Sequence, residues 1–270
     1  MKTLLRLVTL LVALSLTAVV AHGKPQLGIE TWTCREMTFE ETVLFAKKHG
    51  ITQLQLYRKH IDASAPVEEN LRKKAFLEEH GVKAYTFGVC PTSMDKEENR
   101  KLFELAKLFG VKLLVVEPGN LAEWDNLEEL VREYDIKLAI HNHGTGTVYG
   151  NPSTVKHILA ARDHRIGVCV DIGWVTSAGF DAESVFRNYG DRVYDMHLKD
   201  KRLDQQNDSG RHVDTHIGLG NTNYAGLVAA IKESGWSGVM ALETDSAEFV
   251  KDPTEFVTHG KKFFEAHFGK

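Results

Sequence analysis

Eight short apolar segments, rich in Val, Ile, Leu and aromatic residues, alternate with amphipathic segments along this chain. This alternation is typical of strand–helix units wound around a parallel sheet. The ends of successive segments are 24, 33, 27, 26, 28, 26 and 46 residues apart. Because no segment carries the protection that an open sheet edge needs, the repeat predicts a closed, single-domain (β/α)8 TIM barrel. The predicted strands are Gln26–Thr33, Gln53–Tyr57, Lys83–Cys90, Lys112–Glu117, Lys137–His143, Gly167–Asp171, Val193–His197 and Gly238–Glu243.

Helix signals between the strands agree with this division. Thr38 precedes Glu41 in a capping-box arrangement, and Gly50, Gly81 and Gly110 end the first three of the eight expected helices. The one long spacing contains Lys199–Tyr224, which is polar and shows neither helical nor strand periodicity. It predicts a long irregular loop over the active face of the barrel.

The first residues have the layout of a secretory signal peptide. Lys2 and Arg6 precede an apolar run from Leu7 to Val20, and small residues favour cleavage after Ala21. We therefore expect residues 1–21 to be a signal peptide and 22–270 to be the barrel of a secreted or periplasmic protein. A membrane anchor is the alternative, although the apolar run is short for a bilayer core of about 30 Å. After cleavage we expect no stable membrane span.

Charge and cysteine content narrow the function classes. The formal net charge is −4 and becomes −6 without Lys2 and Arg6, whereas a nucleic-acid-binding surface needs the opposite sign. Cys34, Cys90 and Cys169 are an odd number, and two lie inside apolar strand patterns. They predict small buried thiols rather than a disulfide framework. The sequence leaves a homo-oligomer open.

Polar residues occupy the ends of the predicted strands four to eight, where barrel-lining strands usually carry Val or Leu. In a barrel these ends meet at one cavity. Three carboxylates and three imidazoles buried together would cost many kcal/mol without a cation, so the cluster predicts one divalent metal ion. Mixed imidazole and carboxylate ligands suit Mn, Co, Zn, Mg or Fe. The cluster comprises Glu117, His141, His143, Asp171, His197 and Glu243.

Five segments resemble motifs of the xylose isomerase-like barrels, a superfamily of sugar isomerases, ketose 3-epimerases, inosose dehydratases and endonuclease IV. The resemblance covers the whole chain after residue 21 and implies a metal held by His141, Asp171, His197 and Glu243. The segments are LAIHNHG (138–144), CVDIGW (169–174), MHLKD (196–200), HIGLG (216–220) and ALETD (241–245).

The chain departs from the family pattern at several positions. His141 stands where Glu is common, which is similar to an exported subgroup with an IHNHG motif, some of whose members act on 3-keto-glycosides. Trp174 replaces a common His, which argues against a multi-zinc site. Endonuclease IV needs His where this chain has Tyr57 and Cys90, which excludes DNA repair.

The resemblance implies proton transfer next to a carbonyl on an unphosphorylated sugar, by an isomerase or epimerase. Glu243 is expected to be both ligand and base, with Glu117 as the other acid or base. His143 shares a strand face with His141 and is expected to shuttle protons or bind substrate. Lys199 either stabilises an oxyanion or pairs with Asp171 or Asp200. Trp32 and Trp174 either stack on sugar rings or belong to the core, and His216 is a further substrate-binding candidate.

Two alternatives remain from the sequence. A lyase or hydratase would use nearly the same residues to eliminate a β-substituent from a 3-keto-glycoside. A secreted carbohydrate-binding barrel without catalysis is suggested by Trp174, whereas intact Asp171, His197 and Glu243 speak against it.

Overall fold

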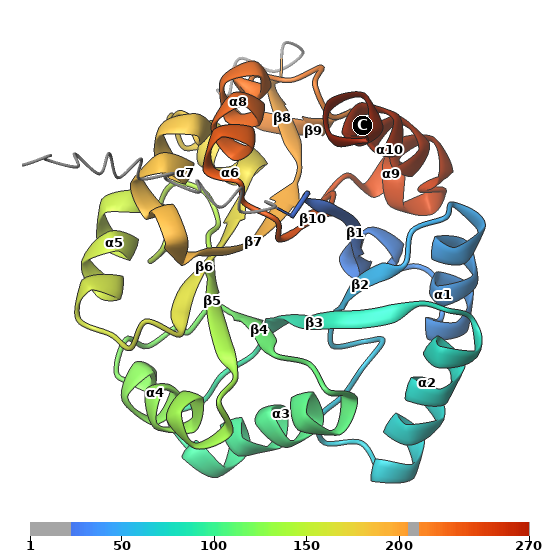
Figure 1. Cartoon of the computed structure of the whole chain (residues 1–270), viewed down its shortest axis with the longest axis vertical. Helices are drawn as coiled ribbons and strands as arrows, with labels where there is room; N and C mark the ends of the chain where they lie inside the picture. The colour runs from blue at the N-terminus through green and yellow to red at the C-terminus, as the bar shows by residue number, and fades with distance from the viewer. Residues whose placement is uncertain (1–22, 205–210, 270) are drawn as a thin grey trace, which may run out of the picture.

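The computed structural model describes residues 23–204 and 211–269, so the predicted signal peptide lies outside the described residues. Eight parallel strands close into a barrel in the order β1-β10-β7-β6-β5-β4-β3-β2, and the helices surround it (Figure 1). The predicted (β/α)8 barrel is confirmed. The barrel strands are β1 (Gln26–Glu30), β2 (Gln53–Leu56), β3 (Lys83–Cys90), β4 (Leu113–Val116), β5 (Lys137–His141), β6 (Ile166–Asp171), β7 (Val193–Leu198) and β10 (Val239–Leu242).

The helices follow the strands, but two of the eight units carry a pair of helices rather than one. Asp171 ends β6 and directly caps a short extra helix, because its Oδ1 accepts from Trp174 N at 2.8 Å. The helices are α1 (Phe39–Lys48), α2 (Val67–Glu79), α3 (Lys96–Phe109), α4 (Glu123–Tyr134), α5 (Pro152–Ala160), α6 (Ile172–Ser177), α7 (Ala182–Tyr189), α8 (Tyr224–Ser234), α9 (Ala247–Lys251) and α10 (Thr254–Phe268).

Local signals act as the sequence predicts. Thr38 and Glu41 form the complete capping box of α1. Gly110 ends α3 with φ +73°, a left-handed conformation that a side chain disfavours. The first strand is shorter than predicted because Thr31–Cys34 turns into a 3-10 helix, where Glu30 accepts from Trp32 N at 2.7 Å. β5 likewise ends at His141, before His143.

The prediction of an irregular loop over Lys199–Tyr224 is wrong in part. β8 (Asp200–Leu203) and β9 (His212–Thr215) form an antiparallel hairpin there, with Asp200 opposite Thr215 and Leu203 opposite His212. Both strands have only four residues and are largely polar, so they lack the alternation of apolar residues that marks a strand.

The interior is a continuous apolar core around the barrel that includes Leu54, Phe87, Leu114 and Trp124. Cys34 and Cys169 are buried and Cys90 is half-buried, and all three thiols are free, as predicted. No helix in the described ranges is long and apolar enough to cross a membrane.

Candidate active site

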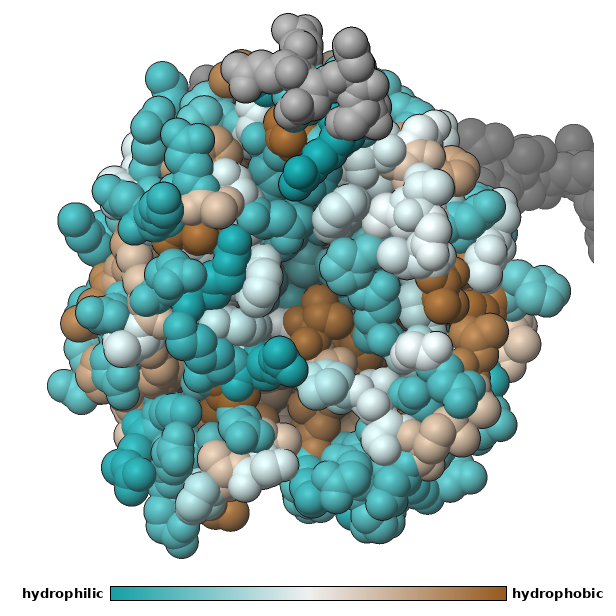
Figure 2. Space-filling model, turned by 180° about the vertical axis from the view of Figure 1, so that it is seen from behind, coloured by the Kyte–Doolittle hydropathy of each residue, from teal (hydrophilic) through white to brown (hydrophobic). Residues whose placement is uncertain are grey.

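A pocket of about 210 Å³ opens at the carboxyl ends of the barrel strands. Figure 2 views this face of the molecule, where hydrophobic side chains reach the surface near the middle among mostly hydrophilic ones. We call it the barrel-mouth pocket. It is lined by Glu30, Trp32, Tyr57, Arg58, Val89, His141, His143, His197, Glu243 and Asp245.

Strand register brings the predicted metal ligands together beneath this pocket. Asp171 pairs with His197 across β6 and β7, and His197 pairs with Ala241 of β10. Asp171 Oδ2 lies 3.6 Å from His141 Nε2 and 3.7 Å from His197 Nδ1. Glu243 Oε2 adds a second carboxylate 3.6 Å from His197 Nδ1. All four side chains are nearly inaccessible to solvent.

The hydrogen bond on the far side of His197 suits a metal ligand. Gln55 Oε1, near the end of β2, accepts from His197 Nε2 at 3.2 Å. In the neutral tautomer that donates through Nε2, the lone pair of Nδ1 faces Asp171 and Glu243, and this buried atom has no hydrogen-bond partner among the described residues. An imidazole that donates through one nitrogen and offers the other is the usual arrangement around a protein-bound metal. The residues present therefore fit a divalent ion.

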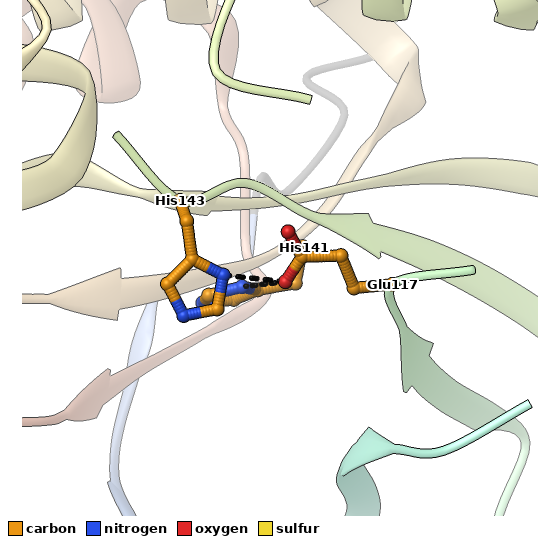
Figure 3. A group of neighbouring side chains, drawn as sticks. All are labelled: Glu117, His141 and His143. Atoms are coloured by element: carbon orange, nitrogen blue, oxygen red, sulfur yellow. Dashed lines mark hydrogen bonds and ion pairs between the residues drawn. The ribbon is translucent and has the colours of Figure 1, made fainter. Parts of the chain in front are cut away.

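Glu117, just beyond β4, binds two imidazoles at once (Figure 3). Its Oε2 lies 3.3 Å from His141 Nδ1 and 2.5 Å from His143 Nδ1. Burial would raise the pKa of Glu117, but the two imidazoles lower it to about 2. For His143, burial lowers the pKa and Glu117 more than offsets this, so the pKa of His143 is raised. Glu117 thus contacts the outer nitrogen of His141, whose Nε2 faces Asp171.

Lys199 is a buried cation within the cluster. Its Nζ lies 2.6 Å from Glu243, 2.7 Å from Asp245 and 3.4 Å from Asp171. Burial lowers the pKa of Lys199, but these carboxylates hold it well above its usual value. Gly173 leaves room for the lysine stem, because a Cβ there would lie 2.7 Å from Lys199 Cγ. The ion pair with Asp171 is one of the two alternatives that the sequence left open for Lys199. Lys199 also supplies part of the positive charge that the sequence predicts from a metal ion alone.

The two tryptophans occupy different positions. Trp32 is 39% exposed, lines the barrel-mouth pocket and packs edge-on against Tyr57 with ring centroids 5.6 Å apart. Trp174 lines a neighbouring, larger cavity instead, and Lys201 Nζ lies 3.9 Å from its ring centroid. Trp32 is therefore the better placed of the two for a ligand in the barrel-mouth pocket.

His216 lies away from this pocket. Its ring packs against Phe249 and His259, both with centroids 4.8 Å away. The glycine-rich turn after it wraps Asp200, whose Oδ2 accepts from the backbone N–H of Gly218 at 3.0 Å and Gly220 at 2.8 Å. A structural role in holding the hairpin explains this segment better than the predicted substrate contact.

Three site residues were missed from the sequence. Glu30 ends β1, Gln55 is the next-to-last residue of β2, both are buried, and Asp245 lies two residues past Glu243. Burial, together with Glu243, raises the pKa of Glu30 well above its usual value. The rule that identified Glu117 and Asp171, a polar residue at the end of a buried strand, also applies to Glu30, whereas Gln55 lies before the end of its strand. It missed Glu30 because the predicted strand ran on to Thr33.

Fold and site together define a (β/α)8 barrel of an enzyme family, with ligand-type side chains at the carboxyl ends of its strands. Three groups within the described residues bring such atoms within 4.8 Å of one another: Glu117–His141–His143, His141–Asp171–His197 and Cys169–Asp195–His197. The model of the family "Xylose isomerase-like TIM barrel" matches residues 43–267, and the chain belongs to this family.

Individual relatives are distant. Inosose dehydratase from Clostridium perfringens is 22% identical over 274 residues, covering 86% of this chain and 90% of that protein. Inosose dehydratase from Lacticaseibacillus casei is 24% identical over 154 residues, which span about half of either protein. The IolI protein, solved with a bound zinc atom, superposes with a TM-score of 0.72 at 18% identity over 91% of this chain and 100% of that chain. At this identity the structural likeness concerns the fold.

Proposed function

We propose that the chain is a divalent-metal-dependent sugar isomerase or epimerase, which transfers a proton at the carbon next to the carbonyl of an unphosphorylated keto- or hydroxy-sugar. The observation that carries the proposal is the buried His197 Nδ1, which has no hydrogen-bond partner among the described residues and faces the carboxylates of Asp171 and Glu243 at the pocket floor. A metal ion held by these side chains would suit a reaction at a carbonyl group in which negative charge develops on the oxygen.

The metal would be held by His141, Asp171, His197 and Glu243, with Glu117 hydrogen-bonded behind His141. A divalent ion, one of Mn, Co, Zn, Mg or Fe, would supply Lewis-acid stabilisation of negative charge on the substrate's carbonyl oxygen. The zinc atom in the IolI protein supports a metal in this fold without choosing among these ions.

The chain's own residues supply the proton transfers. Glu243 lines the pocket and serves as the base that takes the proton from the carbon next to the carbonyl. Lys199, whose Nζ donates to Glu243 Oε2 at 2.6 Å, orients this carboxylate. His143 lies half-exposed at the pocket wall and, with its pKa raised, returns a proton from its ring. Return to a carbon gives the isomer or epimer.

Elimination is the second candidate, and His143 would serve as its acid. After Glu243 removes the proton, the electron pair forms the carbon–carbon double bond and the bond from the β-carbon to its oxygen substituent breaks. The leaving oxygen takes its proton from His143. The relatives named inosose dehydratase lend weight to this outcome, and so does His141, since no carboxylate stands at that metal position to act as a second base.

Solvent exchange tests the proposal. Metal-loaded protein in D₂O should incorporate deuterium into a ketose or 3-keto-glucoside next to the carbonyl, and Glu243→Gln should slow exchange by at least 100-fold. The surface variant Glu129→Gln is the control. A product of unchanged mass in H₂O indicates isomerisation, whereas a released aglycone with an unsaturated keto-sugar indicates elimination. Metal-bound protein that exchanges no sugar of a broad panel would contradict both and favour a binding barrel.

Export belongs to the proposal as well. A signal peptide over residues 1–21 would place the enzyme outside the cytoplasm, where unphosphorylated sugars and glycosides occur. Cell fractionation with detection of the mature N-terminus tests it, and a mature chain that begins at Met1 would contradict it.

A further inference from the structure

A second cavity of about 290 Å³ lies beside the barrel-mouth pocket, between the carboxyl ends of β2 and β3 and helix α3. None of the proposed metal ligands or proton-transfer groups lines it. Its lining includes Leu56, Arg58, Ala63, Phe87, Cys90 and Leu105.

The two cavities meet at Arg58, which lines both. Adjacent residues of β3 also face the two cavities, since Val89 lines the barrel-mouth pocket and Cys90 lines the second cavity. The side chain of Arg58 is exposed and makes no hydrogen bond or ion pair with the residues that the structure describes. Its guanidinium is therefore available to a ligand that spans the junction.

The second cavity combines an apolar floor with a fixed polar rim. Leu56, Phe87 and Leu105 form part of the floor, and burial raises the pKa of Cys90 to about 12, so its thiol adds no charge at neutral pH. At the rim, Asn99 fixes the loop by accepting from Ser93 N at 2.9 Å and donating to Ser93 O at 2.8 Å. An apolar interior with a few oriented polar groups is typical of a small-molecule site.

Volume indicates that the two cavities act together. Each alone is below the range of about 300–1,000 Å³ that ligand sites usually occupy, and joined they fall within it. We propose that the second cavity is the subsite for an aromatic aglycone, so that the substrate is an aryl glycoside whose keto-sugar ring occupies the barrel-mouth pocket. This inference rests on the proposed sugar chemistry, and Arg58 would contact the oxygen atoms at the junction.

Binding of unreactive glycosides tests the subsite without turnover. Calorimetry should give a Kd for p-nitrophenyl glucoside at least 10-fold lower than for methyl glucoside, because only the aryl group fills the second cavity. Ala63→Phe fills this cavity and should abolish the preference. Ala65→Phe is the matched control, since Ala65 lies in the same turn, is equally half-buried and does not line the cavity.

Each outcome decides the proposal. A preference lost in Ala63→Phe and kept in Ala65→Phe supports it. Equal affinities for the two glycosides, no binding of either, or a preference retained in Ala63→Phe overturns it. If both Phe variants lose the preference, Leu105→Trp decides, because it fills the cavity from α3 without altering the turn: retention there overturns the subsite. Failure of the proposed function would appear separately, as a missing deuterium exchange with the aryl preference intact.

Discussion

At the residue scale, one buried amide determines which nitrogen His197 offers to the site. Gln55 Oε1 accepts from His197 Nε2. The Tyr85 hydroxyl lies 3.3 Å from Gln55 Oε1 and 3.1 Å from Asp195 Oδ1, and its one proton is shared between these two acceptors. This chain of hydrogen bonds runs through the barrel interior below the pocket. It fixes the ring orientation before any ligand arrives, which lowers the entropic cost of binding.

Gln55→Leu should therefore weaken metal binding by about 10- to 100-fold, because the ring of His197 loses the acceptor that orients it. Competition with a fluorescent chelator measures the affinity. Gln53→Leu is the matched control, since Gln53 lies on the same strand and donates to Gln26 at the surface. Equal losses in both variants, or none in Gln55→Leu, would contradict the role of this amide.

His60 makes the stability of the barrel pH-dependent. It is buried between Met37 O at 3.1 Å and Thr42 Oγ1 at 3.4 Å, and burial lowers its pKa to about 4. The unfolded value is about 6.5, so the unfolded chain binds more protons than the folded chain between pH 6.5 and pH 4. The contribution of neutral His60 is complete above pH 6.5 and is lost as the pH falls toward 4.

Urea unfolding at pH 7.0 and pH 4.5 tests whether the stability falls with falling pH. Wild-type protein should lose about 2–3 kcal/mol more between the two pH values than His60→Gln, because glutamine cannot titrate. His164→Gln removes an exposed histidine, with 83% of its side chain accessible, and should behave like wild type. If His60→Gln shows the same pH dependence as wild type, the imidazole does not remain neutral in the folded chain.

Sequence reasoning reached the individual site residues unevenly. Glu117, His141, Asp171, His197 and Glu243 were identifiable because a polar residue at the end of an apolar strand is unusual and barrel strands converge. What each side chain contacts was not identifiable, because contacts depend on register and rotamers. Thus Lys199 could be placed near the cavity with Asp171 as an alternative partner, but its shorter contacts with Glu243 and Asp245 follow only from the folded chain.

At the element scale, the β8–β9 hairpin is held on the barrel by a buried ion pair. Lys201 Nζ on β8 lies 2.5 Å from Asp214 Oδ1 on β9 and 3.3 Å from Asp245 Oδ2. The other oxygen of Asp214 accepts from Thr244 Oγ1 at 2.7 Å and Asp245 N at 2.6 Å. The hairpin thereby ties the segment after β10 to the region of Lys199, so its integrity bears on the site.

Asp214→Asn should destabilise the protein by about 3 kcal/mol, because Lys201 would remain buried with only the more distant Asp245 as partner. The double variant Lys201→Met/Asp214→Asn should be more stable than Asp214→Asn alone, since it removes the unpaired charge. Urea unfolding of the wild type, the two single variants and the double variant measures the coupling free energy between Lys201 and Asp214. The surface pair Arg187–Glu233 is the comparison and should couple by less than about 1 kcal/mol. Additive effects of Lys201→Met and Asp214→Asn would contradict the argument.

Strands and helices whose apolar residues recur at a regular spacing were predictable from the sequence. Elements without such a spacing were not. β3 is found at its predicted bounds, Lys83–Cys90, because its eight residues are bounded by clear signals. The hairpin was missed because ion pairs and backbone contacts to the barrel, rather than apolar alternation, stabilise it. The same applies to Thr31–Cys34, where the carboxylate of Glu30 turns the chain out of β1.

At the scale of the whole molecule, closure of the barrel is what makes the site. The metal-ligand candidates lie on β5, β6 and β7 and directly after β10, so none of these strands alone holds an ion. The number of repeats predicted this closure from the sequence. The second cavity, by contrast, depends on how α3 packs beside the ends of β2 and β3, which no repeat encodes.

Because the ligands join separate strands, metal binding should stabilise the entire barrel. A divalent ion at 100 times its Kd adds about 2.7 kcal/mol, and a chain of this length gains about 2–4 °C per kcal/mol. We therefore expect Tm to rise by about 5–10 °C with the preferred ion and to fall again with EDTA, as measured by calorimetry. His141→Ala and His197→Ala should each abolish the rise.

The control for this prediction also discriminates between two metal sites. His143 belongs to the group Glu117–His141–His143 but not to His141–Asp171–His197. If the ion binds as proposed, His143→Ala should keep the rise in Tm, because the ring of His143 hydrogen-bonds to Glu117, behind the ligand His141. A rise lost in His143→Ala and kept in His197→Ala would instead place the ion beside Glu117. His141 belongs to both groups, so the His141→Ala variant cannot show which group binds the ion. Comparison of His143→Ala with His197→Ala can show this, because each of these residues belongs to only one of the two groups.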